Sequence, residues 1–408
     1  MTHRLYYTDP YLRAFDATVA RVDRRDDRLL VRLDRTAFYP TSGGQPFDTG
    51  RLGPLTVVDV VDEEDGTVTH VTELRTQNSE PGTNPEPGTL NPEPGQVVSC
   101  VIDWPRRFDH MQQHSGQHLL SAAFDKLFAV RTLSFHLGGA VSTIDLAREM
   151  SPAEIAAAET EANRVVWEDR PVTIRFADAE EAARLPLRKE PARGGTLRLI
   201  DVEGFDLSAC GGTHVARTGG VGTIAVASWE RFRGGQRLEF LCGGRALAGY
   251  RTLRDAMTAS VRLISVLPVE LPGAIERLQA DARDQRRAMD GAQRELARYR
   301  ADELAAGAEQ TATCRLVAHA VDADANGLKA LATAIAAKPG FLVVLVSAST
   351  PALAVIARSA DVSVSAQKLL ASLIGQFGGR GGGRPELAQG GGLVATPESS
   401  FERVRASI

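Results

Sequence analysis

Two short clusters hold the residue types best able to do chemistry: His114-Ser-Gly-Gln-His118 and Cys210-Gly-Gly-Thr-His214. Each cluster places two good zinc donors four positions apart. On a helix, residues with that spacing share a face, with Cβ atoms about 5–6 Å apart, which suits the two imidazoles of the first cluster. Imidazole and thiolate donors fit Zn²⁺ better than Mg²⁺ or Ca²⁺, which prefer oxygen. We therefore predict one zinc ion per chain, with the ligands His114, His118, Cys210 and His214.

The residues around each cluster indicate how it is held. Leu119, Leu120 and Phe124 continue an apolar stripe after His118, which predicts a helix over about 110–127. The glycines of the second cluster disfavour a regular helix and favour a tight loop that closes over the metal. The spacing leaves open whether the site is structural, with four protein ligands, or catalytic, with a position for water or substrate.

Length and composition limit the class of protein. A chain of 408 residues is long enough for two or three domains, and 43% hydrophobic residues are typical of a soluble globular protein. No run of about 18 apolar residues is present, and the N-terminus lacks the apolar core of a secretory signal, so we expect no membrane span. The scattered cysteines argue against a disulfide framework and favour a reducing cytoplasm.

The overall charge of −4 does not indicate a nucleic-acid-binding protein. Locally, the segment 217–251 holds six arginines against two glutamates, and such a strip could neutralise backbone phosphates. The alternative is that arginine is simply the usual surface cation of this chain, which has few lysines. Composition leaves both interpretations open.

The pattern along the chain predicts an α+β protein of several parts. Residues 1–100 are β-rich, with strands near 29–33 and 55–61 and a Pro/Gly-rich insertion at 77–96. Residues 101–260 form the zinc-binding domain, with a further helix at 152–167. Residues 261–310 form a long amphipathic helix or helical hairpin, and 311–408 a C-terminal α/β domain. The long helix could pack on its own domain or form a homodimer through the C-terminal half.

A glycine-rich run, 378–392, lies in the last part of the C-terminal domain. Glycine at that density allows positive φ and close backbone approach, so exposed amides could bind phosphates. Arg380, Arg384 and Gln389 lie within this run, and we predict that they bind an anionic ligand or nucleic acid. The alternative is a flexible linker.

These motifs together resemble a known family. The segment Thr36-Ala-Phe-Tyr-Pro-Thr-Ser-Gly-Gly-Gln45 and the two donor clusters resemble the three motifs of the alanyl-tRNA synthetase editing domain and of its free-standing AlaX-type relatives. The stretch 109–120 is especially similar to the long free-standing form, and the run 378–392 resembles the signature of the DHH-associated C-terminal domain. The resemblance covers nearly the whole chain, and the chain departs from the family pattern only at the Pro/Gly-rich insertion. It implies a β-barrel-like N-terminal subdomain.

The resemblance implies hydrolysis of the ester that joins serine, or secondly glycine, to the terminal adenosine of tRNA(Ala). It implies that Thr36 reads the serine hydroxyl and that Gln45 shapes the pocket and positions water. Zinc could either activate water or only orient the acceptor end, and we favour orientation because four protein ligands already form a closed set. A site built to hydrogen-bond a hydroxyl can reject the analogue lacking it by roughly 10⁴–10⁵. Because the editing-like domain begins within the first residues, we expect a chain that removes an amino acid from tRNA but attaches none.

Two other functions remain open from the sequence. One is a zinc-stabilised tRNA-binding module without catalysis. The other is a different ester or peptide hydrolase, although the His-Glu-x-x-His pattern of zinc proteases is missing because Ser115 follows His114.

Overall fold

The computed structural model describes residues 1–74, 91–188 and 196–408. Its contacts divide the chain into two compact units, 1–259 and 260–408. The finer division into four parts remains a prediction. Of the predicted insertion at 77–96, residues 77–90 lie outside the described residues and residues 91–96 are described.

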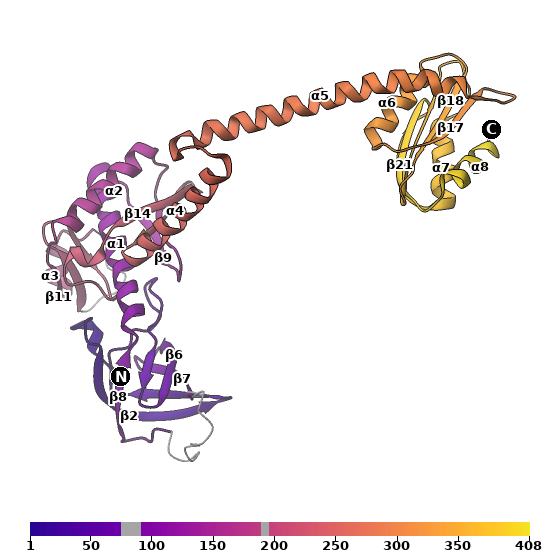
Figure 1. Cartoon of the computed structure of the whole chain (residues 1–408). Helices are drawn as coiled ribbons and strands as arrows, with labels where there is room; N and C mark the ends of the chain where they lie inside the picture. The colour runs from indigo at the N-terminus through magenta and orange to yellow at the C-terminus, as the bar shows by residue number, and fades with distance from the viewer. Residues whose placement is uncertain (75–90, 189–195) are drawn as a thin grey trace. The chain divides into compact units, whose positions relative to one another are not determined.

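The N-terminal strands close into a β-barrel (Figure 1). In β3, Leu29, Val31 and Leu33 are buried and alternate with more exposed residues, because successive side chains of a strand point to opposite faces. The barrel-like subdomain predicted for this region is thereby confirmed. The barrel strands, in spatial order, are β2 (Ala14–Arg25), β3 (Arg28–Leu33), β7 (Val68–Leu74), β6 (Leu55–Asp62), β5 (Gly50–Leu52) and β8 (Val97–Ile102). A short parallel pair, β1 (His3–Arg4) and β4 (Arg35–Thr36), lies outside it.

Helix α1 (Trp104–Phe128) follows the barrel directly and carries the first donor pair. Asp103 caps its N-terminus by accepting a hydrogen bond from Arg106 N, and Ala129 ends it in the left-handed conformation. The helix starts six residues before the predicted residue 110. The apolar stripe marks only the buried part of the helix, whereas the Asp103 cap and Pro105 in the first turn determine where it begins. Every residue from His110 to Phe124, apart from the half-buried Gln112, is buried.

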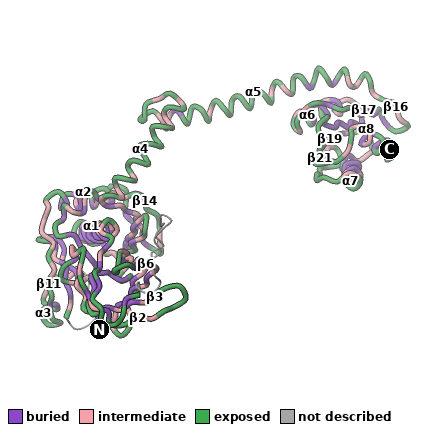
Figure 2. Tube along the Cα trace, turned by 60° about the horizontal axis from the view of Figure 1, so that its bottom comes forward, coloured by how far each residue is buried: buried purple, intermediate pink, exposed green. Residues whose placement is uncertain are grey.

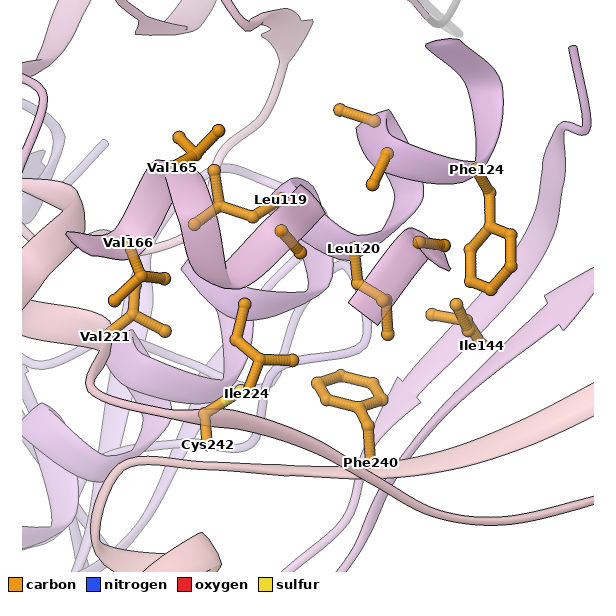
Figure 3. Packing of buried hydrophobic residues seen from close by; sticks show 14 of the residues in the cluster. Leu119, Leu120, Phe124, Ile144, Val165, Val166, Val221, Ile224, Phe240 and Cys242 are labelled. Carbon is orange, nitrogen blue, oxygen red and sulfur yellow. The ribbon is translucent and has the colours of Figure 1, made fainter. Parts of the chain in front are cut away.

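The core beside α1 is built against an antiparallel sheet. Figure 3 shows Leu120 and Phe124 of α1 packed with Ile144 and Phe240, which come from two strands of that sheet. The sheet order is β14 (Ile224–Phe232), β15 (Gly235–Cys242), β10 (Ser142–Leu146) and β9 (Thr132–Leu137). Helix α2 (Pro152–Trp167), predicted at these residues, covers α1 from another side, and a Ser151–Glu154 capping box fixes its start.

A second antiparallel sheet supplies the other half of the site. Its strands are β11 (Val172–Ala177), β12 (Leu197–Val202) and β13 (Asp206–Ala209), with the short helix α3 (Ala179–Arg184) after β11. Strand β13 leads directly into the second donor cluster, which forms the loop that the sequence predicted.

Long helices join the two units. Helix α4 (Gly244–Ile264) spans the boundary between them, and α5 (Leu271–Ala306) lies within the segment 261–310 that was predicted to be a long amphipathic helix or helical hairpin. Figure 2 shows that α5 is exposed along much of its length. Ala297 and Ala301, near its end, are buried against α6 (Ala325–Ala336), so this part of the helix packs on its own domain.

The C-terminal domain contains a mixed sheet with helices α6, α7 (Ala366–Phe377) and α8 (Pro397–Arg405). Its strands, in spatial order, are β16 (Glu309–Gln310), β17 (Arg315–Val321), β18 (Phe341–Ser347), β19 (Ala352–Arg358), β21 (Leu387–Leu393) and β20 (Arg380–Arg384). The glycine-rich run is therefore a β-hairpin and not the flexible linker that its composition left open. A Cβ at Gly381 would lie 2.5 Å from Gln389 O, so the two strands can pair this closely only with glycine at this position. Glycine therefore occurs here although its strand propensity is weak.

Among the described residues, no single helix is long and apolar enough to cross a membrane. One bent pair of helices, α4 with Pro268–Ala306, passes that test jointly by length and composition.

Candidate metal centre

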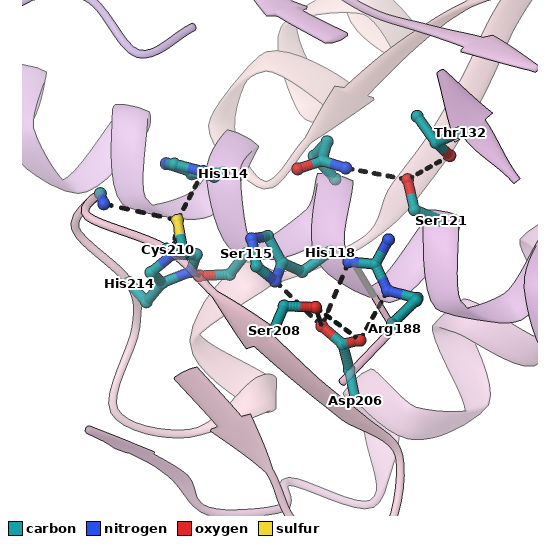
Figure 4. Close-up of polar contacts among 12 residues, drawn as sticks. His114, Ser115, His118, Ser121, Thr132, Arg188, Asp206, Ser208, Cys210 and His214 are labelled. Atoms are coloured by element: carbon teal, nitrogen blue, oxygen red, sulfur yellow. Dashed lines mark hydrogen bonds and ion pairs between the residues drawn. The ribbon is translucent and has the colours of Figure 1, made fainter. Parts of the chain in front are cut away.

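The structure brings the four predicted zinc ligands together. One donor atom from each of His114, His118, Cys210 and His214 lies within 4.8 Å of the others. Cys210 Sγ is 3.4 Å from His114 Nε2 and 3.3 Å from His214 Nε2. Two ligands come from one face of α1 and two from the loop after β13, as Figure 4 shows. Clusters 96 residues apart in the chain thus share one buried site.

Each imidazole is oriented by a second protein group on its other nitrogen. Nδ1 of His114 lies 2.8 Å from Gln45 Oε1, and Nδ1 of His118 lies 2.9 Å from Asp206 Oδ2. Nδ1 of His214 lies 3.2 Å from Ser115 Oγ. When Nδ1–H donates to a fixed acceptor, Nε2 keeps its lone pair for a metal ion. The three Nε2 atoms are therefore prepared as ligands.

Charge around the cluster favours a thiolate. Burial acts to raise the pKa of the Cys210 thiol, but electrostatic interaction with His114 and His214 and hydrogen bonds with His114 and His118 lower it well below its ordinary value. A thiolate is the form that binds metal. The arrangement therefore supplies one anionic sulfur and three imidazole nitrogens.

Asp206 supports His118 from a buried ion-pair network (Figure 4). Burial acts to raise the pKa of this carboxyl, but hydrogen bonds and charge from His118 and Arg188 lower it well below its ordinary range. Burial likewise acts to lower the pKa of His118, while Asp206 and Cys210 raise it to about 9. Arg188 Nε lies 2.6 Å from Asp206 Oδ1, and Ser208 Oγ also donates to this carboxylate.

The loop that carries Cys210 is held by close packing and by one arginine. A Cβ at Gly212 would lie 2.1 Å from His114 Cε1, so only glycine lets the loop approach the ring. Arg198 Nη1 donates to the carbonyl oxygens of Cys210 and Gly212, at 2.7 and 2.9 Å. These contacts fix the loop geometry without using a ligand atom.

The residues predicted to read the substrate lie in different surroundings. Gln45 belongs to the centre, since it contacts His114 and also Thr213, to which its Nε2 donates at 2.8 Å. Thr36 is fully buried, and its Oγ1 lies 2.8 Å from His70 Nε2 and accepts from Phe38 N. The substrate roles assigned to Thr36 and Gln45 remain predictions.

A cavity of about 160 Å³ opens beside the centre. His118 and Cys210 line it, so a group bound there would lie next to the metal ligands. The remaining lining residues come from the loop after β4, from α1, β9 and β13 and from the segments after α3 and β13, namely Gly43, Gln117, Thr132, Leu133, Ser134, Phe135, Arg188, Ser208, Ala209 and Gly211.

The residues predicted to bind tRNA lie in the second unit. Arg380 and Arg384 are exposed on β20, and Gln389 is exposed on β21, where it pairs with Gly382. The arginine-rich segment 217–251 is less suited to binding backbone phosphates than its composition suggested. Its members are largely engaged in ion pairs with protein carboxylates, namely Arg217–Asp169, Arg231–Glu149, Arg237–Asp145 and Arg245–Asp109.

Sequence reasoning missed the residues that support the ligands. Asp206, Ser115 and Arg198 carry no spacing signal, because they reach the site through strand pairing and helix packing. The nearest sequence signal is the position of Asp206, four residues before Cys210 on the strand that leads into the loop.

Comparison with known proteins defines the class. The chain matches the threonyl and alanyl tRNA synthetase second additional domain at residues 197–239 and the DHHA1 domain at residues 313–407. The first match includes Cys210 and His214, so the loop half of the metal centre lies in a domain of aminoacyl-tRNA synthetase type.

Full-length relatives extend this result. The chain is 31% identical to the alanyl-tRNA editing protein AlaX-L of Pyrococcus horikoshii, over 98% of this chain and 97% of that protein. It is 33% identical to the alanine–tRNA ligase of Pyrococcus abyssi, over 95% of this chain but only 42% of the ligase. The C-Ala domain of Aquifex aeolicus alanyl-tRNA synthetase is similar in structure over 24% of this chain, with 25% identity and a TM-score of 0.23. The chain belongs to the AlaX-L family of alanyl-tRNA editing proteins.

Proposed function

We propose that this chain is an aminoacyl-tRNA deacylase that hydrolyses seryl-tRNA(Ala), with glycyl-tRNA(Ala) as a second substrate. The observation that carries the proposal is the cavity lined by His118 and Cys210, two members of a complete metal-ligand set, in a chain of the AlaX-L family. The cavity is small, which suits an aminoacyl group of two or three carbons better than a large side chain.

The donor set fits Zn²⁺, one ion per chain. One thiolate and three imidazoles form a mixed sulfur–nitrogen set, and each imidazole has its other nitrogen engaged by protein. When bound, zinc supplies a positive charge that orients the acceptor end of the tRNA. Since four protein groups already make a closed set, we favour orientation over activation of water.

The protein contributes positioning and exclusion of bulk solvent. An aminoacyl ester is already labile, so holding it next to an ordered water can provide a large part of the acceleration. His118, which lines the cavity, is held by Asp206, and His114 behind it is held by Gln45, so the metal ligands beside the ester have fixed orientations. In this proposal Gln45 acts by fixing His114 as well as by shaping the pocket.

Thr36 is proposed to read the serine hydroxyl. His70 Nδ1 lies 2.9 Å from Val31 O, so its hydrogen points to that carbonyl, and Nε2 accepts from Thr36 Oγ1. The hydroxyl of Thr36 also accepts from Phe38 N. Because a hydroxyl has two lone pairs, one acceptor position is left for a serine hydroxyl, and the methyl of alanine cannot use it.

The tRNA itself is proposed to contact Arg380, Arg384 and Gln389 on the C-terminal hairpin, where exposed guanidinium groups and glycine backbone suit phosphate. The homodimer through the C-terminal half also remains a proposal. It is motivated by apolar side chains that α5 leaves exposed, namely Ile275, Leu278, Met289, Leu296 and Tyr299.

The proposal is tested by incubating the purified protein with seryl-, glycyl- and alanyl-tRNA(Ala). We expect fast loss of the seryl ester, slower loss of the glycyl ester and little loss of the alanyl ester. Cys210→Ser, which removes the sulfur ligand, is the negative control and should lose deacylase activity together with bound zinc. Hydrolysis of none of the three would favour a zinc-stabilised tRNA-binding module, and equal loss of the alanyl ester would exclude editing.

A further inference from the structure

Gln117 lies between the two zinc-binding histidines of α1 and lines the cavity. Its side chain is 3% exposed. The amide nitrogen Nε2 donates to Ser121 Oγ at 2.8 Å. The amide oxygen Oε1, by contrast, has no hydrogen-bond partner among the described residues. Buried acceptors are nearly always paired, so an unpaired one beside a catalytic cavity calls for a partner from outside the chain.

The orientation of this amide is fixed by a hydroxyl relay. Ser121 Oγ accepts from Gln117 Nε2 and also from Thr132 Oγ1, at 2.8 Å in each case (Figure 4 shows Ser121 and Thr132). Thr132 itself lines the cavity. With the donor edge of the amide held by Ser121, the edge left for a ligand is the carbonyl oxygen. Because one N–H of the amide is held by Ser121, the carbonyl oxygen is fixed in orientation and can accept a hydrogen bond from a ligand.

The other hydroxyls that line the cavity already have strong acceptors. Ser134 Oγ donates to Asp145 Oδ2 at 2.5 Å, and Ser208 Oγ donates to Asp206. Arg188, the cation of the cavity wall, is paired with Asp206. A ligand with a hydrogen-bond donor that enters the cavity can therefore bind to Gln117 Oε1, a side-chain carbonyl oxygen of the lining that no described residue engages.

We propose that Gln117 Oε1 accepts a hydrogen bond from the α-ammonium group of the aminoacyl ester and so positions its carbonyl carbon beside the metal centre. The inference rests on the proposed function. The α-ammonium group is the part of an aminoacyl ester that is most costly to remove from water without an acceptor. A charged donor also makes the stronger kind of hydrogen bond. Gln117 then selects esters with a free α-amine, whereas selection for the serine hydroxyl is the role proposed for Thr36.

The test compares two esters of tRNA(Ala): seryl, and 3-hydroxypropanoyl, which keeps the hydroxyl but lacks the α-amine. We expect the unaltered protein to hydrolyse the seryl ester with a kcat/KM about 10- to 100-fold higher, the range of one hydrogen bond to a charged group. Gln117→Met, which keeps length but removes the acceptor, should lower this preference and leave only the part that comes from activation of the ester by its own ammonium group. Gln117→Glu, which restores an acceptor, should regain it.

Two controls separate this inference from its premises. Gln112→Met changes a glutamine of the same helix that donates to Gly220 O and does not line the cavity, so it should keep the full preference. Bound zinc should be unchanged in Gln117→Met, which excludes collapse of the centre. If Gln117→Met keeps the preference of the unaltered protein for the amine, the inference is wrong. If the unaltered protein hydrolyses neither ester, the proposed function fails instead.

Discussion

The carboxylate of Asp206 lies 2.9 Å from Nδ1 of His118 and is itself held by Arg188 and Ser208. This carboxylate–imidazole pair sets the tautomer and the ring orientation of one ligand. Neighbouring groups of this kind commonly contribute about 10- to 100-fold to metal affinity. The pair links β13 to α1, the helix that carries two of the ligands, and the other two ligands lie in the loop that follows β13.

Asp206→Asn should therefore weaken zinc binding by about 10- to 100-fold, because a neutral amide polarises the imidazole less than a carboxylate does. Competition with a zinc chelator measures the dissociation constant. Asp201→Asn is the matched control, since Asp201 pairs with Arg175 at an exposed site on the same sheet. An equal Kd for Asp206→Asn and the unaltered protein would contradict this role.

Thr36→Val should reduce seryl-tRNA(Ala) deacylation by at least about 10-fold, which corresponds to the loss of one buried hydrogen bond to substrate. Valine has the shape of threonine and lacks the hydroxyl. Thr36→Ser keeps the hydroxyl and should retain activity, which separates hydrogen bonding from packing. Bound zinc should stay constant in both variants. Seryl activity that survives in Thr36→Val would remove Thr36 from substrate recognition.

His70 should make the first unit less stable in acid. Burial lowers its pKa to about 4, although the hydrogen bond to Val31 acts in the opposite direction. The unfolded chain has an ordinary histidine pKa near 6.5, so it binds the proton first as the pH falls. Stability that is fully present above about pH 6.5 is then lost toward pH 4, by about 2 kcal/mol between pH 7.5 and 5.0.

This pH dependence is measured by urea unfolding of the protein and of His70→Asn at both pH values. The variant should lose about 2 kcal/mol less than the unaltered protein on acidification. All other titrating groups, including the buried His110, cancel in the difference. The same acid loss in both proteins would show that His70 does not titrate as its burial requires.

Arg380 and Arg384 should contribute to tRNA affinity through phosphate contacts. Replacing both with glutamine should weaken binding and lower the slope of log K against log salt by about 1.5, at about 0.7–0.9 for each phosphate contact. Arg405→Gln, which removes an arginine of the same domain whose guanidinium pairs with Glu309 at 3.0 Å, is the control for loss of a surface charge outside the hairpin. A double variant with an unaltered salt slope would exclude the hairpin from the tRNA interface.

Local patterns predicted a large part of this fold. The bounds of α2 agree with those expected, and α5 lies within the segment predicted to be a long amphipathic helix, because caps and periodicity are encoded within each element. The two donor pairs could be recognised for the same reason, since each spans five residues. The glycine hairpin was missed, because pairing with β19 outweighs the weak strand propensity of glycine.

The supporting residues could not be predicted in this way. Asp206 meets His118 across 88 positions and Gln45 meets His114 across 69, so their roles arise only when the chain is folded. The unpaired oxygen of Gln117 is likewise a property of packing and not of residue type. A glutamine inside the His114–His118 pair reads simply as a polar residue of a helix.

The proposed deacylation requires a single zinc ion held by His114, His118, Cys210 and His214. X-ray absorption at the zinc edge, on protein loaded with zinc and analysed for metal content, tests this assignment. We predict one zinc per chain with one sulfur at about 2.3 Å and three nitrogens at about 2.0–2.1 Å. A first shell without sulfur, or one with two sulfurs, would contradict it.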